Sequence, residues 1–319
     1  MTIQILILLV GLALIVFGAD FLVDGSSAIA RKAGISEFVI GLTIVGFGTS
    51  CPELVVSLTG ALKGVADISV GNVIGSNLFN TLLILGITAL IAPVSVTPSN
   101  RKRDIPIALL VTFLFVVLGM NHTLLGIGNA DSLSRVEGIV LLLIFVAYMY
   151  YCFKFGKEEP QEEEGQKVNK IWVAVLLVIA GLAGLVTGGR LFVNSATEIA
   201  RMIGVSDKFI AITILAGGTS LPELATCIVA AAKHKDQLAL GNILGSNVFN
   251  ILLILGISAV LTPLSFASIA IVDVATLLLS AVLVWLWTYT GTKDRIDRWE
   301  GGIFLLCYAA YMVWLFLTV

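Results

Sequence analysis

The segment TIVGFGTSCPEL, residues 43–54, places a proline, a glutamate, glycines and hydroxyl residues inside an apolar stretch. It recurs as TILAGGTSLPEL at residues 213–224, with eight of twelve positions identical and no gap. A second pair follows in the same register, GNVIGSNLFNTLLILG at 71–86 and GNILGSNVFNILLILG at 241–256, with twelve of sixteen positions identical. A general bias towards Leu and Ile cannot produce matched Thr, Ser, Pro, Glu and Asn. The chain therefore contains an internal duplication, offset by 170 residues.

The composition indicates a membrane protein. Of the 319 residues, 58% are hydrophobic and only 13% are charged, whereas soluble domains carry about 25% charged residues. The apolar residues form long runs, each long enough to cross the hydrocarbon core. We predict an all-α integral membrane protein whose ten transmembrane helices lie near residues 3–28, 38–62, 69–92, 105–121, 136–155, 171–199, 209–231, 238–262, 268–290 and 300–318.

Five spans in each copy imply that the two copies have opposite orientations, because an odd number of crossings returns the chain on the other side. We predict a first five-helix repeat at 1–155, an acidic cytoplasmic linker at 156–170 and a second five-helix repeat at 171–319. Inverted-topology repeats of transporters form their substrate site at the repeat interface, near the bilayer midplane. A duplication that serves stability alone would explain matched packing residues, but not matched carboxylates.

The basic residues predict the orientation. With the N-terminus outside, the cytoplasmic loops collect 14 of the 19 Lys and Arg residues. The positive-inside rule then places both termini outside the cytoplasm. We expect a monomeric multi-pass protein of the cell membrane (an inner or plasma membrane), surrounded by lipid.

Glu53 and Glu223 fall in the middle of the second and seventh predicted spans. A charged side chain at the bilayer centre costs about 2.5–3.5 kcal/mol, so a cation or a proton should compensate each one. Pro52 and Pro222 remove a helical hydrogen bond beside them, and we expect helices 2 and 7 to break there. Freed carbonyl groups are tolerated at this depth only where they line a cavity. Protonated glutamates that pack as polar contacts are the alternative.

Neutral oxygen ligands surround the glutamates in the sequence. Hydroxyl groups lie within one turn of each carboxylate, at Thr49, Ser50, Thr219 and Ser220. In the third and eighth spans a four-residue spacing puts polar residues on one helical face, namely Asn72, Ser76 and Asn80, and again Asn242, Ser246 and Asn250. Polar packing between helices would also explain that face. Next to broken helices we favour Ser76, Asn80, Ser246 and Asn250 as ligands, because Ca²⁺ takes six to eight hard oxygens.

With GTSCPEL and GTSLPEL each followed by GN-x-x-GSN-x-FN, the chain resembles the calcium/cation antiporter superfamily, and specifically prokaryotic sodium/calcium exchangers. The resemblance implies that Glu53 and Glu223 bind Ca²⁺ and compete for Na⁺. It also implies backbone oxygen from Gly46 and Ala216, and side-chain oxygens from Thr49, Ser50, Thr219, Ser220, Ser76 and Ser246. The first and sixth spans would be a mobile pair.

One feature departs from that family. Its sodium/calcium exchangers commonly carry an aspartate at one of the positions of Asn80 and Asn250, whereas both are neutral here. Two carboxylates balance one Ca²⁺ or two monovalent ions, which puts the exchange of three Na⁺ for one Ca²⁺ in question.

The predicted function is a secondary active antiporter that exchanges Ca²⁺ for Na⁺ by alternating access. A H⁺/Ca²⁺ exchanger and a K⁺-dependent Na⁺/Ca²⁺ exchanger are alternatives, and a cation channel is a rival of another class. We do not expect the protein to be an enzyme, because no Ser/His/Asp triad or zinc-binding His motif accompanies the glutamates. We expect no cofactor apart from the transported ions. A net charge of −2 gives no case for nucleic acid.

Overall fold

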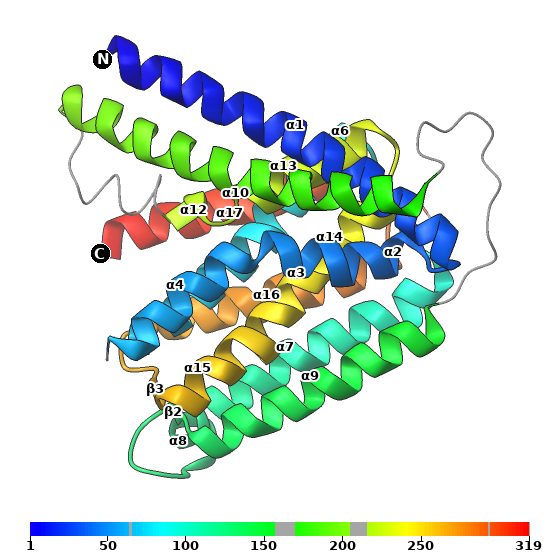
Figure 1. The fold of residues 1–319 in the computed structure, drawn as a ribbon. Coiled ribbons are helices and arrows are strands. Elements are labelled where there is room, and N and C mark those ends of the chain that lie inside the picture. Colours follow the sequence, from blue (N-terminus) through cyan, green and yellow to red (C-terminus); the bar gives the residue numbers. More distant parts are fainter. Residues whose placement is uncertain (64–65, 157–169, 205–215, 293, 319) are drawn as a thin grey trace.

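The computed structural model describes residues 1–63, 66–156, 170–204, 216–292 and 294–318. It is a bundle of long helices, and both termini lie at the same end of the bundle (Figure 1). The elements of the first half are α1 (Thr2–Ala33), α2 (Glu37–Ile40), η1 (Gly41–Val45), α3 (Gly46–Thr49), α4 (Cys51–Leu62), α5 (Ala66–Leu78), η2 (Phe79–Ile84), α6 (Leu85–Ile91), β1 (Val94–Ser95), η3 (Asn100–Asp104), α7 (Ile105–Gly119), α8 (Asn121–Leu125), β2 (Ser132–Leu133) and α9 (Arg135–Phe155).

The described elements of the second half follow a similar order, without equivalents of η3 and α8. They are α10 (Ile171–Met202), α12 (Ala216–Gly218), α13 (Leu221–Ala232), α14 (Asp236–Phe249), η5 (Asn250–Leu255), α15 (Gly256–Leu261), β3 (Leu264–Ser265), α16 (Ile271–Trp287), β4 (Arg295–Ile296) and α17 (Arg298–Thr318). The elements labelled η are π-helical turns, which occur mainly as single turns and often at functional sites.

Several helices are suited to a membrane. Among the described residues, six are long and apolar enough to cross one: α1, α9, α10, α17, and the continuous helices Ile68–Ile91 and Asp236–Leu261. A seventh span arises if the bent pair Glu37–Thr49 and Cys51–Leu62 is taken as one. Shorter apolar helices occur at Leu221–Ala232 and Ile271–Trp287. The predicted linker falls mainly on 157–169, and the predicted start of the seventh span on 209–215, both outside the described residues.

Helices α1 and α10 pack against each other through glycines. A Cβ on Gly18 would lie 2.9 Å from the carbonyl oxygen of Gly181, and one on Gly11 would lie 2.9 Å from that of Gly188. The contacts run in opposite directions along the two helices, so α1 and α10 are antiparallel, and they lie side by side across one face of the bundle (Figure 1). Because these helices are equivalent in the duplication, the two halves start in opposite directions.

Two short strand pairs join the halves. Strand β1 pairs with β4, with Val94 opposite Ile296, and β2 pairs with β3, with Ser132 opposite Ser265. Strands β1 and β3 occupy equivalent places in the two copies, yet each pairs with a strand of the other half. The halves therefore interlock instead of forming separate units.

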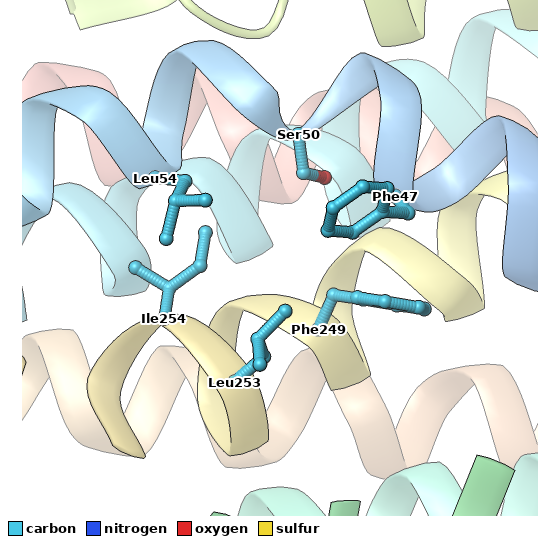
Figure 2. Close-up of a pocket in the computed structure, with 6 residues that line it drawn as sticks. All are labelled: Phe47, Ser50, Leu54, Phe249, Leu253 and Ile254. Atoms are coloured by element: carbon cyan, nitrogen blue, oxygen red, sulfur yellow. The ribbon is translucent and has the colours of Figure 1, made fainter. Parts of the chain in front are cut away.

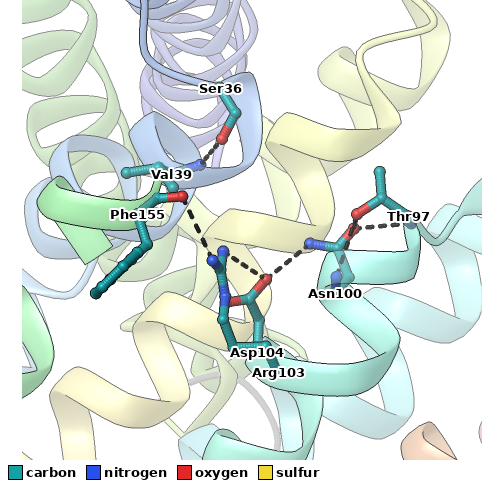
Figure 3. Close-up of polar contacts among 7 residues, drawn as sticks. All are labelled: Ser36, Val39, Thr97, Asn100, Arg103, Asp104 and Phe155. Carbon is teal, nitrogen blue, oxygen red and sulfur yellow. Dashed lines mark hydrogen bonds and ion pairs between the residues drawn. The ribbon is translucent and has the colours of Figure 1, made fainter. Parts of the chain in front are cut away.

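Polar contacts fix the start of α7 (Figure 3). The amide of Asn100 donates to Asp104 Oδ2 at 3.2 Å, and Arg103 Nε donates to Asp104 Oδ1 at 2.9 Å. Arg103 also donates to the carbonyl oxygen of Phe155, at the end of α9. On the neighbouring helix, Ser36 caps α2 by accepting from the backbone N–H of Val39.

One ion-pair cluster connects α1 with the second half. Lys233, just after α13, places its ammonium group 2.6 Å from a carboxylate oxygen of Asp20 and 2.6 Å from one of Asp24. The duplication puts Arg190 and Asn194 at the positions equivalent to these aspartates. The equivalent cluster cannot form in the other copy, and the pairing is a property of one end of the bundle.

Helix α14 crosses the first broken helix at very short range. A Cβ on Gly41 would lie 2.3 Å from the carbonyl oxygen of Leu238, and one on Gly245 would lie 2.2 Å from that of Leu42. Only glycine allows the two backbones to approach this closely. This contact brings the polar face of α14 beside the break that follows η1 and α3.

Candidate cation-binding site

The first broken helix turns at Ser50. Helix α3 ends at Thr49, Ser50 adopts φ −81° and ψ 6°, and α4 begins at Cys51 after a bend of 48°. Pro52 lies in the first turn of α4, where its missing N–H has no helical partner in any case. Glu53 therefore sits at a helix N-terminus, which favours a negative charge. The break predicted from Pro52 is confirmed.

The second copy has the same local geometry. Helix α12 ends at Gly218, Ser220 adopts φ −91° and ψ 9°, and α13 begins at Leu221. Pro222 and Glu223 follow in its first turn, and Glu223, like Glu53, is fully buried. Each carboxylate thus occupies the first turn after a helix break.

The two breaks exchange hydrogen bonds across the duplication. The hydroxyl of Ser50 donates to Glu223 Oε1 at 3.0 Å, and the hydroxyl of Ser220 donates to Glu53 Oε1 at 2.9 Å. Each serine thus serves the glutamate of the other half. These crossed contacts place the two breaks face to face.

The serines of α5 and α14 approach the same centre. Ser76 Oγ lies 3.3 Å from Glu53 Oε1 and 3.0 Å from Ser220 Oγ. Ser246 Oγ lies 3.5 Å from the carbonyl oxygen of Gly46, which also accepts from the backbone N–H of Ser50. The predicted ligands Ser76, Ser246 and Gly46 are therefore brought to the carboxylates or to the break beside them.

Four asparagines pair across the halves where α5 and α14 pass into π-helical turns. Asn80 Nδ2 donates to Asn247 Oδ1 at 3.1 Å, and Asn250 Nδ2 donates to Asn77 Oδ1 at 2.9 Å. Asn250 Nδ2 also lies 3.3 Å from Ser76 Oγ. Asn250 is thereby connected to Glu53 through Ser76.

Some acceptor oxygens of the cluster have no hydrogen-bond donor. Glu53 Oε2, Glu223 Oε2, Asn80 Oδ1 and Asn250 Oδ1 are buried and have no hydrogen-bond partner among the described residues. A buried acceptor without a partner costs about 1–3 kcal/mol. All four are oxygens that only accept, and they come in equivalent pairs from the two halves. Such a set is complementary to a cation.

The residue types of the cluster favour a hard cation. Within the described residues, no group of three or more His, Cys, Asp and Glu could hold a metal ion. The cluster offers two carboxylates with hydroxyl, amide and carbonyl oxygens, the ligands that Ca²⁺ and other hard cations prefer.

The remaining predicted ligands lie at the two breaks, and the Thr49 side chain interacts with Glu223. Thr49 Oγ1 lies 3.1 Å from Asn242 Oδ1 and 3.0 Å from the carbonyl oxygen of Val45. Thr219 lies in the second break and is half-buried, and Ala216 begins α12. The sequence reasoning missed Asn77 and Asn247, although both are part of the repeated GSN-x-FN and their identity in the two copies could have identified them.

An apolar wall borders the first break (Figure 2). Ser50 lines a cavity of about 10 Å³ together with Phe47, Leu54, Phe249, Leu253 and Ile254. This volume corresponds to about one water molecule. On this side the break faces hydrocarbon side chains, so its polar groups point to the glutamate cluster.

Residues 3–154 and 173–317 match the family model described as sodium/calcium exchanger protein. The putative antiporter CaxA of Alkalimonas amylolytica is 38% identical over 99% of this chain and 99% of that protein. Sodium/calcium exchanger MaX1 of Methanosarcina acetivorans is 33% identical, again over 99% of both. The solved structure of the sodium-calcium exchanger NCX_Mj soaked with 10 mM Na⁺ and zero Ca²⁺ is similar with a TM-score of 0.85 and 34% identity, covering 98% of this chain and 99% of that one.

Proposed function

The chain belongs to the sodium/calcium exchanger protein family, and on that basis we propose that it exchanges Ca²⁺ for Na⁺ across a membrane by alternating access. Cation antiport is the activity named for its relatives, and the family is one of transporters, not of enzymes. The observation that carries the proposal is the symmetric set of unpartnered oxygens on Glu53, Glu223, Asn80 and Asn250.

The proposed site combines those oxygens with the groups that hold the glutamates. Ser50, Ser220 and Ser76 position the carboxylates through hydrogen bonds. The remaining proposed ligands are Thr49, Thr219, Ser246 and the backbone oxygens of Gly46 and Ala216. Bound ions would satisfy the acceptors, and the empty site would hold two buried negative charges close together. Such a site should resist closing without an ion, which couples the two fluxes.

The proposed architecture is ten spans in two inverted five-helix repeats, 1–155 and 171–319, joined by the linker 156–170. The antiparallel packing of α1 and α10 supports the inversion. An even number of crossings agrees with both termini at one end of the bundle (Figure 1). The basic loops then place that end outside the cytoplasm of a cell membrane.

We further propose that the exchange is electroneutral. Because Asn80 and Asn250 are neutral, Glu53 and Glu223 supply two negative charges, which one Ca²⁺ or two Na⁺ would balance. A third Na⁺ would leave a net positive charge in a buried site, where an uncompensated charge is costly.

Flux measurements in vesicles test both points. Purified protein in proteoliposomes should take up ⁴⁵Ca²⁺ when the vesicles hold Na⁺, and should not when choline replaces it. A potassium diffusion potential should leave the accumulated Ca²⁺ unchanged, whereas an exchange that moves one net charge would gain about 2.3 kcal/mol per 100 mV. Uptake that follows a pH gradient or requires K⁺ would identify one of the other exchangers, and uptake without a trans ion would identify a channel.

A further inference from the structure

Asn77 and Asn247 occupy equivalent places in the duplication, three residues before Asn80 and Asn250. They face the opposite half, because Asn77 accepts from Asn250 and Asn247 accepts from Asn80. Neither has a direct contact to a glutamate among the described hydrogen bonds. They instead accept hydrogen bonds from Asn250 and Asn80, the two amides whose Oδ1 atoms have no partner.

An asparagine can present either its oxygen or its NH₂ group to an ion, and the two ends differ in sign. With its oxygen towards the ion the side chain is a cation ligand, and with its NH₂ group towards the ion it repels a cation. The amide therefore needs a fixed orientation, and the hydrogen bonds of its NH₂ group provide it. The NH₂ group of Asn250 donates to Asn77 Oδ1 and Ser76 Oγ, and Oδ1 of Asn250 has no hydrogen-bond partner.

The orientation of Asn77 is fixed in turn by a backbone group. Its Nδ2 donates to the carbonyl oxygen of Asn247 at 3.2 Å. A backbone carbonyl can only accept, so Asn77 must present its NH₂ group there and its oxygen to Asn250. The order of donors and acceptors is therefore determined from Asn247 through Asn77 to Asn250.

The second arm is anchored by a hydroxyl. Asn247 Nδ2 donates to Thr81 Oγ1 at 2.8 Å, and Asn247 Oδ1 accepts from Asn80. A hydroxyl can both donate and accept, so it fixes the amide less firmly than a carbonyl does. The duplication places Ile251 opposite Thr81, so this anchor occurs in only one copy.

We propose that Asn77 and Asn247 are positioning residues that hold Asn250 and Asn80 with their oxygens towards the transported cation. The inference rests on the proposed function, since it assumes that these oxygens bind the ion. Asn77 is the stronger of the two, because its own orientation is fixed by a carbonyl.

Equilibrium binding of ⁴⁵Ca²⁺ to the purified protein tests the role of Asn77. Asn77→Leu removes the acceptor while keeping the branched shape of the side chain, and it should weaken binding by about tenfold, the equivalent of losing one buried acceptor bond. Thr88→Val is the matched control, because Thr88 is buried and its hydroxyl bonds only a carbonyl of its own helix. That variant should bind as the unaltered protein does.

Rescue separates positioning from packing. Asn250→Asp puts oxygen on both ends of the side chain, so its orientation no longer matters. Asn77→Leu should therefore weaken binding in the Asn250 protein and should not weaken it by more than about threefold in the Asn250→Asp protein. An equal loss in both proteins would overturn the inference and leave Asn77 with a packing role.

Two further results keep the inference distinct from the proposed function. If Asn77→Leu does not yield monodisperse protein, Asn247→Leu with and without Asn80→Asp asks the same question of the other arm. Unaltered protein that binds neither Ca²⁺ nor Na⁺ would overturn the proposed function and this inference with it. Unaltered protein that binds both ions, with full binding in the Leu variants, would overturn the inference alone.

Discussion

Replacing Glu53 with glutamine removes one of the two buried charges while keeping the shape of the side chain. The glutamine oxygen can still accept from Ser220 and Ser76, so the local contacts of the break remain available. A carboxylate and Ca²⁺ at a contact distance of about 2.4 Å attract each other by about 14 kcal/mol at an effective dielectric constant of about 20. Dehydration and the retained neutral oxygen offset most of this attraction, and a net loss of about 1.5–3 kcal/mol, as for a hydrogen bond to a charged group, is tenfold or more in affinity.

We therefore expect Glu53→Gln to bind Ca²⁺ at least about tenfold more weakly and to lose Na⁺-driven ⁴⁵Ca²⁺ uptake. Glu223→Gln should behave alike, because Glu223 occupies the equivalent break. Glu37→Gln is the matched control, since Glu37 begins α2 and its partner is Lys235, 3.1 Å away. Affinity within about threefold of the unaltered protein, with uptake retained in both variants, would refute carboxylate ligation.

Three other outcomes follow from contacts described above. Gly181→Ala should lower the free energy of unfolding by about 1–3 kcal/mol, because the added Cβ would lie 2.7 Å from the carbonyl oxygen of Gly18. Gly189→Ala is the control, because a Cβ there meets nothing within 4 Å and should leave the melting temperature unchanged. Equal losses in the two variants would contradict glycine packing. Lys233→Met should cost about 1 kcal/mol, as expected for a partly exposed ion pair, and adding Asp20→Asn should then have little further effect on the melting temperature. Protons compete with cations for the two buried glutamates, so the half-saturating Ca²⁺ concentration for uptake should rise as the pH falls, and a flat acid profile would contradict this competition.

Much of the fold could be predicted from particular residues. Pro52 and the repeated motif predicted a break in the second span, and the chain bends there by 48°. Pro106, inside a predicted span, lies in the first turn of α7, where proline fits without disturbing the helix. The odd number of spans predicted for each copy also predicted that equivalent helices run in opposite directions, as α1 and α10 do.

The details of the site could not be read from the sequence. In the sequence Ser50 lies three residues before Glu53, whereas in the structure its hydroxyl contacts Glu223 of the other copy. Which groups face each other depends on how the two halves dock, and a duplication does not specify that. The π-helical turns that start near Asn80 and Asn250 add residues without changing the apolar pattern, so no periodicity signals them.

The exchange of hydrogen bonds between the two breaks also bears on how the gene changes over time. Loss of the Ser50 hydroxyl would remove a hydrogen bond from Glu223, and loss of the Ser220 hydroxyl would remove one from Glu53. Under the proposed function, a substitution in either copy would therefore impair a proposed ligand that the other copy encodes. Such mutual dependence would keep the two motifs alike, and they match at eight of twelve positions, whereas Asp20 and Asp24, which pair with Lys233, align with Arg190 and Asn194.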